Sequence, residues 1–307
     1  MENNSTFIHI GYPKTGSTTI QRKLFSKLPN LDLVGQPASI EDVMIREVIH
    51  AITDCESLEY DAGNLVSKIK KLKLKSEKLL LTEETFSTGS SLTGRVDRME
   101  IAHRLNYLFP DAKIIVVLRE QTSIIRSFYL QKRKIDPSFS VPFDDWLEQA
   151  KQNAHKENVF QYFDYEKLLT LYKKLFGKKN ILVLTYEDLL SDDVQFLCRI
   201  LEFMGYNPVQ YKDLIKDISS SNENKTVTKR TLYLRVASKR LKLLAKVIPK
   251  PVKDTVKSWS MRGRPFEVHF TEKQRQMIRL LYGKSNRSVT LEWSLNLKEK
   301  GYSVSDE

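Results

Sequence analysis

A glycine-bracketed loop near the start of the chain brings together residue types that bind phosphate. The loop follows the apolar run 7–10, and a helical pattern begins directly after it. In such an arrangement the backbone N–H groups and the positive end of the helix face one anion. The loop and the helix start contain Gly11, Lys14, Thr15, Gly16, Ser17 and Thr18. The spacing therefore favours a phosphate site over a plain surface turn, which Gly and Pro residues also form.

The position of the lysine separates this loop from the common nucleotide-binding signature G-x-x-x-x-G-K-[ST]. Gly11 and Gly16 keep the signature's spacing, and Thr18 keeps its hydroxyl group, but Ser17 stands where the lysine is expected. The only lysine of the loop is Lys14, which lies before the second glycine. A nucleotide kinase or another phosphotransferase is one hypothesis, and it leaves the displaced lysine unexplained.

A second phosphate contact is predicted where another strand ends. The continuous apolar run 113–118 is typical of a buried strand and ends at Arg119, with Ser127 on the helical pattern that follows. An arginine makes forked contacts to phosphate, and ligands of open α/β sheets bind at strand ends. The alternative for Arg119 is a surface ion pair with Glu120.

Two adjacent acids follow a third predicted strand, 78–82. Glu83 and Glu84 are candidates for a general base, and since side chains alternate, only one of them is expected to face a site. The alternative is a solvated helix start, where acidic residues are favoured by the helix dipole.

Taken together, segments 11–18 and 117–129 resemble the two nucleotide motifs of the sulfotransferases that use 3′-phosphoadenosine 5′-phosphosulfate (PAPS). The resemblance implies that Lys14 stabilises the leaving phosphate oxygen, and that the loop with Ser17 or Thr18 holds the 5′-phosphate. It implies further that Arg119 and Ser127 hold the 3′-phosphate. The family needs no metal ion, and no metal-ligand spacing is visible in the sequence.

Weaker similarities extend the resemblance along the chain. In the segment 183–190, Tyr186 matches a family tyrosine near the adenine, and the loop containing Arg262 and Gly263 resembles the one that closes over the 3′-phosphate. Glycan sulfotransferases of the heparan N-deacetylase/N-sulfotransferase kind, and many bacterial members, use a glutamate as the base. Alignment through Phe86 implies Glu84 in this role, with Glu83 as the fallback.

The order of elements predicts one α/β domain over residues 1–307, with a central parallel sheet between helical layers in a P-loop-like sulfotransferase fold. Strands are expected at 7–10, 78–82, 113–118 and 180–185. Helices are expected at 16–27, 95–108, 121–133, 161–175, 192–204 and 271–283. A helical insertion at about 131–160 is expected to shape the acceptor site.

The charge of the chain is concentrated in one stretch. Residues 222–264 hold eight lysines and five arginines against two acids, which accounts for nearly the whole net charge of +12. Within this stretch the pattern predicts a basic amphipathic helix. Its segment 229–257 fits an anionic membrane surface, and the stretch equally fits an acidic glycan or a lipid-linked acceptor. No nucleic-acid motif accompanies it, so nucleic acid is not an expected partner.

Location and activity follow from what else the sequence contains. The N-terminal residues show neither a secretory signal nor a membrane anchor, and Cys55 and Cys198 are interpreted as ordinary buried thiols. We therefore expect a cytoplasmic enzyme that sulfates a carbohydrate or glycolipid hydroxyl group, or an amine, and that attaches peripherally to the inner face of the membrane. A non-enzymatic polyanion-binding protein on the same fold is the remaining hypothesis.

Overall fold

The computed structural model describes residues 5–35, 43–71, 76–89, 96–136, 138–153, 159–220 and 268–306. Arg262, Gly263 and the basic segment 229–257 lie outside the described residues. Contacts divide the chain into two compact units. The first consists of Met1–Glu120, Asp164–Ser221 and Leu281–Glu307, and the second of Gln121–Phe163 and Asn222–Leu280.

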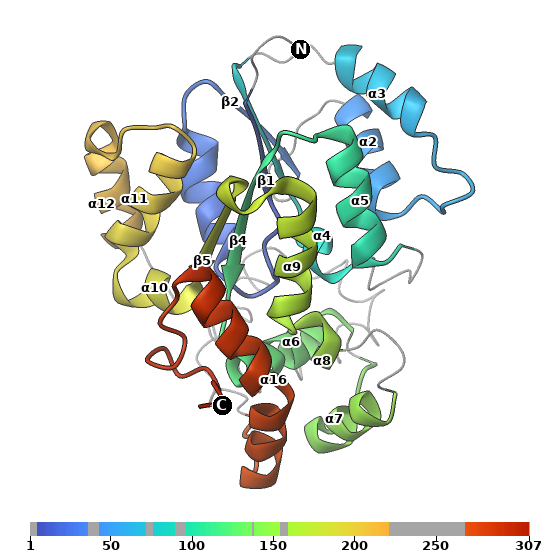
Figure 1. The fold of residues 1–307 in the computed structure, drawn as a ribbon, viewed down its shortest axis with the longest axis vertical. Helices are drawn as coiled ribbons and strands as arrows, with labels where there is room; N and C mark the ends of the chain where they lie inside the picture. Colours follow the sequence, from blue (N-terminus) through green and yellow to red (C-terminus); the bar gives the residue numbers. More distant parts are fainter. Residues whose placement is uncertain are drawn as a thin grey trace, which may run out of the picture. The chain divides into compact units, whose positions relative to one another are not determined.

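A five-stranded, all-parallel sheet forms the centre of the first unit and confirms the predicted α/β class (Figure 1). The strand order is β2 (Leu31–Gly35), β3 (Lys78–Thr82), β1 (Ser5–His9), β4 (Lys113–Leu118) and β5 (Ile181–Thr185). Four of these strands were predicted within two residues at each end. The fifth, β2, was missed because Asp32 and Gly35 interrupt its short apolar run.

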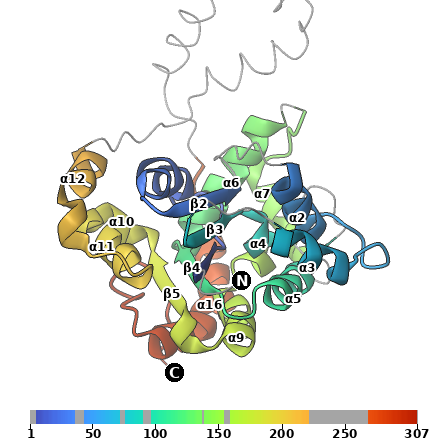
Figure 2. The same ribbon diagram turned by 90° about the horizontal axis from the view of Figure 1, so that it is seen from above.

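Helices cover both faces of this sheet, because continuous apolar strands bury side chains on each side. On one face Phe7, Leu80, Ile115 and Val117 pack with residues of η1 (Ile20–Leu24), α11 (Asp193–Phe203) and α12 (Lys212–Ser220). On the other face lie α5 (Arg98–Leu108) and α9 (Tyr165–Phe176), as the view from above shows (Figure 2).

The first unit also contains further helices and helical turns. They are α1 (Ser17–Thr19), η2 (Phe25–Lys27), α2 (Val43–Thr53), α3 (Ala62–Lys71), α4 (Thr85–Thr88), η3 (Lys178–Asn180), α10 (Tyr186–Ser191) and η4 (Pro208–Tyr211). The helix predicted at 16–27 therefore forms as three consecutive segments, α1, η1 and η2. The η1 segment has π-helical hydrogen bonding, which often marks functional sites. Helices α2 and α3 were not predicted.

The second unit contains α6 (Gln121–Ile135), α7 (Phe143–Gln152) and α8 (Val159–Tyr162). The helix predicted at 161–175 is thus two helices, α8 and α9. Helix α16 (Glu272–Trp293) is longer than predicted, and the boundary between the units falls within it. Within the predicted insertion, the ring centroid of Phe143 lies 5.1 Å from that of Tyr129 and 5.0 Å from that of Phe270. These aromatic side chains therefore form a core of the second unit.

A buried polar network joins three segments of the first unit. Gln21 Nε2 of η1 donates to Thr82 Oγ1 of β3 over 2.6 Å, and the same oxygen lies 2.9 Å from His9 Nδ1 of β1. His9 is completely buried, and this burial lowers the pKa of its imidazole to about 4. The folded protein therefore holds His9 neutral at the end of the central strand β1, beside the end of β3.

This burial makes the stability of the protein depend on pH. In the folded protein His9 stays neutral down to about pH 4, whereas in the unfolded chain it ionises near its ordinary pKa of 6.5. Its contribution to the free energy of unfolding is therefore complete above pH 6.5 and declines as the pH falls toward 4. The decline amounts to at most about 3 kcal/mol. The free energy of unfolding, measured with urea from about pH 7 to about pH 4.5, should fall less steeply with pH for His9→Asn than for the wild type. Identical slopes would contradict the assignment.

Candidate donor site at the strand ends

Parallel pairing brings the carboxyl ends of all five strands to one edge of the sheet. His9 pairs with Thr82 on one side and with Ile115 on the other, so β1 lies between β3 and β4. The chain leaves β1 toward the β2–β3 side and later crosses to the β4–β5 side. Such a reversal of strand order is where open α/β sheets bind ligands. The loops after β1, β3 and β4 carry Lys14, Glu84 and Arg119.

The loop after β1 has the backbone of an anion cradle. Gly16 has φ +82°, and Lys14 has φ +69°, which is unusual for a residue with a side chain. Thr15 Oγ1 donates to the carbonyl oxygen of Tyr12 over 2.6 Å and fixes the turn. Thr15 and Ser17 are buried, whereas Lys14 and Thr18 are exposed. The first N–H groups of a helix lack partners within the helix, and such groups commonly bind anions.

Gly16 is required by space as well as by backbone conformation. A Cβ atom at this position would lie 2.7 Å from Leu189 Cδ2 and 3.4 Å from Tyr186 Cε2. The absence of a side chain thus allows α10 to approach the loop. Tyr186, predicted from the sequence as an adenine contact, is brought directly beside Gly16 of the loop after β1.

The two predicted acids have different surroundings. Glu84 Oε1 accepts a hydrogen bond from Ser17 Oγ over 2.6 Å, whereas Glu83 Oε1 is 3.5 Å from the N–H of Thr85. Burial raises the pKa of Glu83. Glu84 is therefore the acid that contacts Ser17 at the start of α1.

Arg119 lies against the same loop. Its Nη1 donates to the carbonyl oxygen of Lys14 over 2.7 Å, and its guanidinium carbon is 4.5 Å from the ring centroid of Tyr186. The hydroxyl group of Tyr165 contacts both the backbone N–H and the carbonyl oxygen of Arg119. Arg119 is thus a cation fixed at the rim of the cradle, and its side chain has a structural role beyond a surface ion pair.

The remaining predicted residues are placed as follows. Ser127 lies in the second turn of α6, in the second unit, and is partly exposed. The predicted contact of Ser127 with the 3′-phosphate is supported only by the sequence motif in segment 117–129, and the roles of Arg262 and Gly263 likewise have sequence support alone. Cys55 and Cys198 are only partly buried, which corrects the prediction of buried thiols.

Two residues near Arg119 were missed by sequence reasoning. Tyr165 contacts the backbone of Arg119, and Glu187 Oε1 accepts the N–H of Glu120 over 2.9 Å. The one sequence feature that could have indicated Glu187 is its position directly after Tyr186. Its contact with Glu120 joins positions 67 residues apart in the sequence, so no local pattern indicates it.

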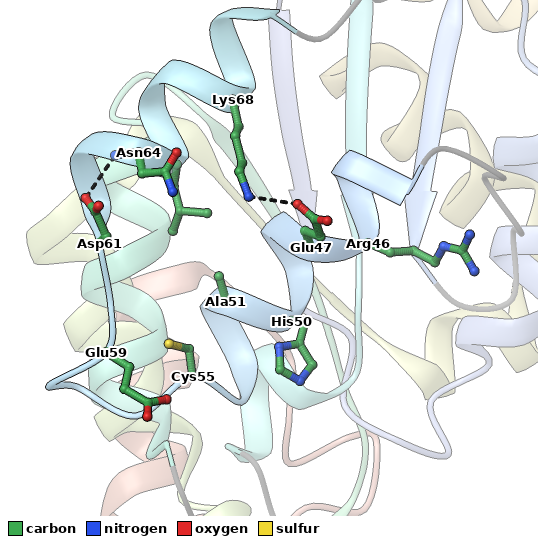
Figure 3. Close-up of a pocket in the computed structure, with 10 residues that line it drawn as sticks. Arg46, Glu47, His50, Ala51, Cys55, Glu59, Asp61, Asn64 and Lys68 are labelled. Carbon is green, nitrogen blue, oxygen red and sulfur yellow. Dashed lines mark hydrogen bonds and ion pairs between the residues drawn. The ribbon is translucent and has the colours of Figure 1, made fainter.

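A separate hollow of about 550 Å³ lies between α2 and α3 (Figure 3). It is lined by groups of both signs, among them an ion pair of 2.8 Å between Lys68 and Glu47. No residue predicted to bind the donor lines it.

Within the described ranges, no cluster of three His, Cys, Asp or Glu side chains suitable for a metal ion is found. The described helices also include none that is long and apolar enough to cross a membrane.

Comparison with known proteins identifies the class to which this fold and site belong. Residues 4–290 match the sulfotransferase domain family, and the chain therefore belongs to that family. It is an enzyme of the PAPS-dependent sulfotransferase class. This assignment rules out the two other hypotheses, a nucleotide kinase and a non-enzymatic binding protein. No curated protein sequence was found to match the chain.

Solved structures show the same fold at low sequence identity. A sulfotransferase from Alicyclobacillus acidocaldarius is 13% identical, with a TM-score of 0.57 over 98% of this chain and 99% of the other. The mouse sulfotransferase SULT7A1, solved in complex with PAP (the donor without its sulfuryl group), is 16% identical, with a TM-score of 0.51 over 98% and 89% of the two chains.

Two properties of Gly16, its left-handed backbone and the lack of space for a side chain, can be tested separately by substitution. Gly16→Ala should destabilise the protein by more than the ~1 kcal/mol that a left-handed alanine costs, and should weaken PAP binding at least about tenfold, because the Cβ atom displaces Leu189. Gly205→Ala is the matched control, since Gly205 has φ +76° but nothing within 4 Å of an added Cβ. Thermal unfolding and calorimetry measure both effects. Equal behaviour of the two variants would refute the steric argument.

Proposed function

We propose that the protein transfers the sulfuryl group of PAPS to a hydroxyl group of a carbohydrate or glycolipid, with Glu84 as the general base. The observation that carries this proposal is the 2.6 Å hydrogen bond from Ser17 Oγ to Glu84 Oε1. It joins the acid after β3 to the helix start that receives the donor's phosphate. A base is thereby positioned beside the cradle where the sulfur atom must lie.

The proposed reaction is an in-line displacement at sulfur. The acceptor oxygen attacks the sulfur atom, the bond between sulfur and the phosphate oxygen breaks, and PAP leaves with that bonding pair. Glu84 takes the proton of the acceptor hydroxyl group. Lys14, which is exposed on a turn with φ +69°, is assigned the role of stabilising the negative charge that develops on the leaving oxygen.

The donor-binding roles are proposed as follows. The 5′-phosphate binds the segment formed by Lys14, Thr15, Gly16, Ser17 and Thr18. Arg119 and Ser127 hold the 3′-phosphate, Tyr186 lies along the adenine, and the loop containing Arg262 and Gly263 closes over the 3′-phosphate. The close approach of Gly16 to Tyr186 and the stacking of Arg119 on the same ring support this assignment in the first unit.

The acceptor class is inferred from charge and from the type of base. A glutamate base is used by glycan sulfotransferases of the heparan kind, and residues 222–264 supply eleven net positive charges for an acidic glycan or a lipid-linked acceptor. An anionic membrane surface would bind the segment 229–257 by the same attraction. We propose that the enzyme acts in the cytoplasm on an acceptor at the inner face of the membrane.

Exchanging the two acids one at a time tests the base. Glu84→Gln should lower kcat by about 10²–10⁴ while changing the affinity for PAP little, since a carboxamide cannot accept the proton but keeps the shape. Glu83→Gln is the matched control, and it should retain most of the activity and lose none of the stability, because burial disfavours ionised Glu83. An inactive Glu83→Gln enzyme beside an active Glu84→Gln enzyme would reverse the assignment.

The acceptor can be identified by labelling. Purified enzyme incubated with sulfur-radiolabelled PAPS and fractionated cell envelope should transfer label to a carbohydrate-containing fraction. Charge reversal at Lys239, Lys242 and Lys246 should reduce this transfer while leaving PAP affinity unchanged, because the attraction to an acidic acceptor is lost. Label recovered only in small phenols or other uncharged alcohols would overturn the proposed acceptor class.

A further inference from the structure

Residues 294–306 extend beyond the part of the chain that matches the sulfotransferase domain family, which ends at residue 290. In the first unit this segment returns along α16. The N–H of Ser305 donates to the carbonyl oxygen of Gly283 over 3.0 Å, and Asn286 Nδ2 donates to that of Ser303 over 2.8 Å. An added Cβ at Gly283 would lie 3.4 Å from Ser305, so this glycine permits the close approach.

The segment delivers one buried hydroxyl group to the strand-end region. Tyr302 is 3% exposed, and its hydroxyl group donates to Glu187 Oε2 over 2.9 Å. The other oxygen of that carboxylate, Oε1, accepts the N–H of Glu120 over 2.9 Å. Glu187 thus bridges Tyr302 to the residue that follows Arg119.

A parallel contact supports the start of α10. Lys300 Nζ lies 2.7 Å from Asp188 Oδ2, and this pair is only one-fifth to one-quarter exposed. The same oxygen of Asp188 accepts the hydroxyl group of Thr185 at the N-cap of α10. Helix α10 begins at Tyr186, on whose ring the guanidinium group of Arg119 stacks.

We propose that Lys300 and Tyr302, the C-terminal clasp, are positioning residues that fix Arg119 for the donor's 3′-phosphate by holding Glu187 and Asp188. This inference rests on the proposed role of Arg119. The clasp reaches Arg119 from two sides, through the backbone at Glu120 and through the ring of Tyr186.

Burial explains why the carboxylate of Glu187 needs both of its hydrogen bonds, one from Glu120 and one from Tyr302 of the clasp. Desolvation raises the pKa of Glu187, while the bonds from Glu120 and Tyr302 oppose that rise. Loss of the tyrosine hydroxyl group would leave a buried carboxylate oxygen without its donor, and such groups rearrange to recover one. The rearrangement would displace the backbone at Glu120 and hence Arg119.

The test compares two nucleotides that differ only in the 3′-phosphate, PAP and adenosine 5′-phosphate. Tyr302→Phe should raise the Kd of PAP about tenfold and that of adenosine 5′-phosphate less than about twofold, as expected for one displaced charged contact. Tyr206→Phe is the matched control, because its hydroxyl group donates to the carbonyl oxygen of Pro29, outside the site. Glu187→Gln is measured in the same way, in case Tyr302→Phe does not fold.

A double-mutant cycle with Arg119→Ala distinguishes a failure of the clasp proposal from a failure of the role proposed for Arg119. In the Arg119→Ala background, Tyr302→Phe should change the Kd of PAP less than about twofold, since the contact through which it acts is already absent. An equal loss in both backgrounds, or for both nucleotides, would show a merely structural role and overturn the clasp. If Arg119→Ala itself keeps full preference for PAP, the 3′-phosphate assignment fails, and the clasp fails with it.

Discussion

Parallel strand pairing is the constraint on which the site depends. Since every strand of the sheet runs in the same direction, the residues that follow β1, β3, β4 and β5 meet at one edge although they are far apart in sequence. The central position of β1 gives its loop neighbours on both sides. Glu84 of the β3 side contacts Ser17, and Arg119 of the β4 side contacts the carbonyl oxygen of Lys14. The sheet thereby brings Glu84, Arg119 and the loop after β1 together at one edge.

Hydrogen bonds among buried and partly buried residues hold the segments at this edge together. The network of His9, Thr82 and Gln21 joins the ends of β1 and β3 to the helical segment after the loop. Tyr165 and Glu187 hold the backbone on either side of the turn from Arg119 to Glu120. Preorganised charges of this kind are what transfer reactions at phosphate and sulfate esters need, because the chemistry is largely positioning.

Local patterns allowed the central features to be predicted from sequence. The four apolar strands, the glycine spacing around Lys14 and the acids after β3 are each visible within about ten residues. The short edge strand β2 was missed because Asp32 and Gly35 disguise it, and the break between α8 and α9 was missed because the apolar pattern continues across it. The preference for Glu84 over Glu83 gained its geometric support only when the contact with Ser17, 67 positions away, was known. Contacts such as that of Tyr302 with Glu187 involve no motif and are set by the tertiary fold.

The left-handed backbone of Lys14 links the stability of the loop to its chemistry. A lysine at φ +69° costs the folded state about 1 kcal/mol that glycine or asparagine would not cost. A variant with either residue would form the turn more readily and lack the ammonium group. With the role proposed for Lys14, the conformation best suited to folding and the side chain best suited to sulfuryl transfer are in conflict at this position, as is typical of strained functional residues.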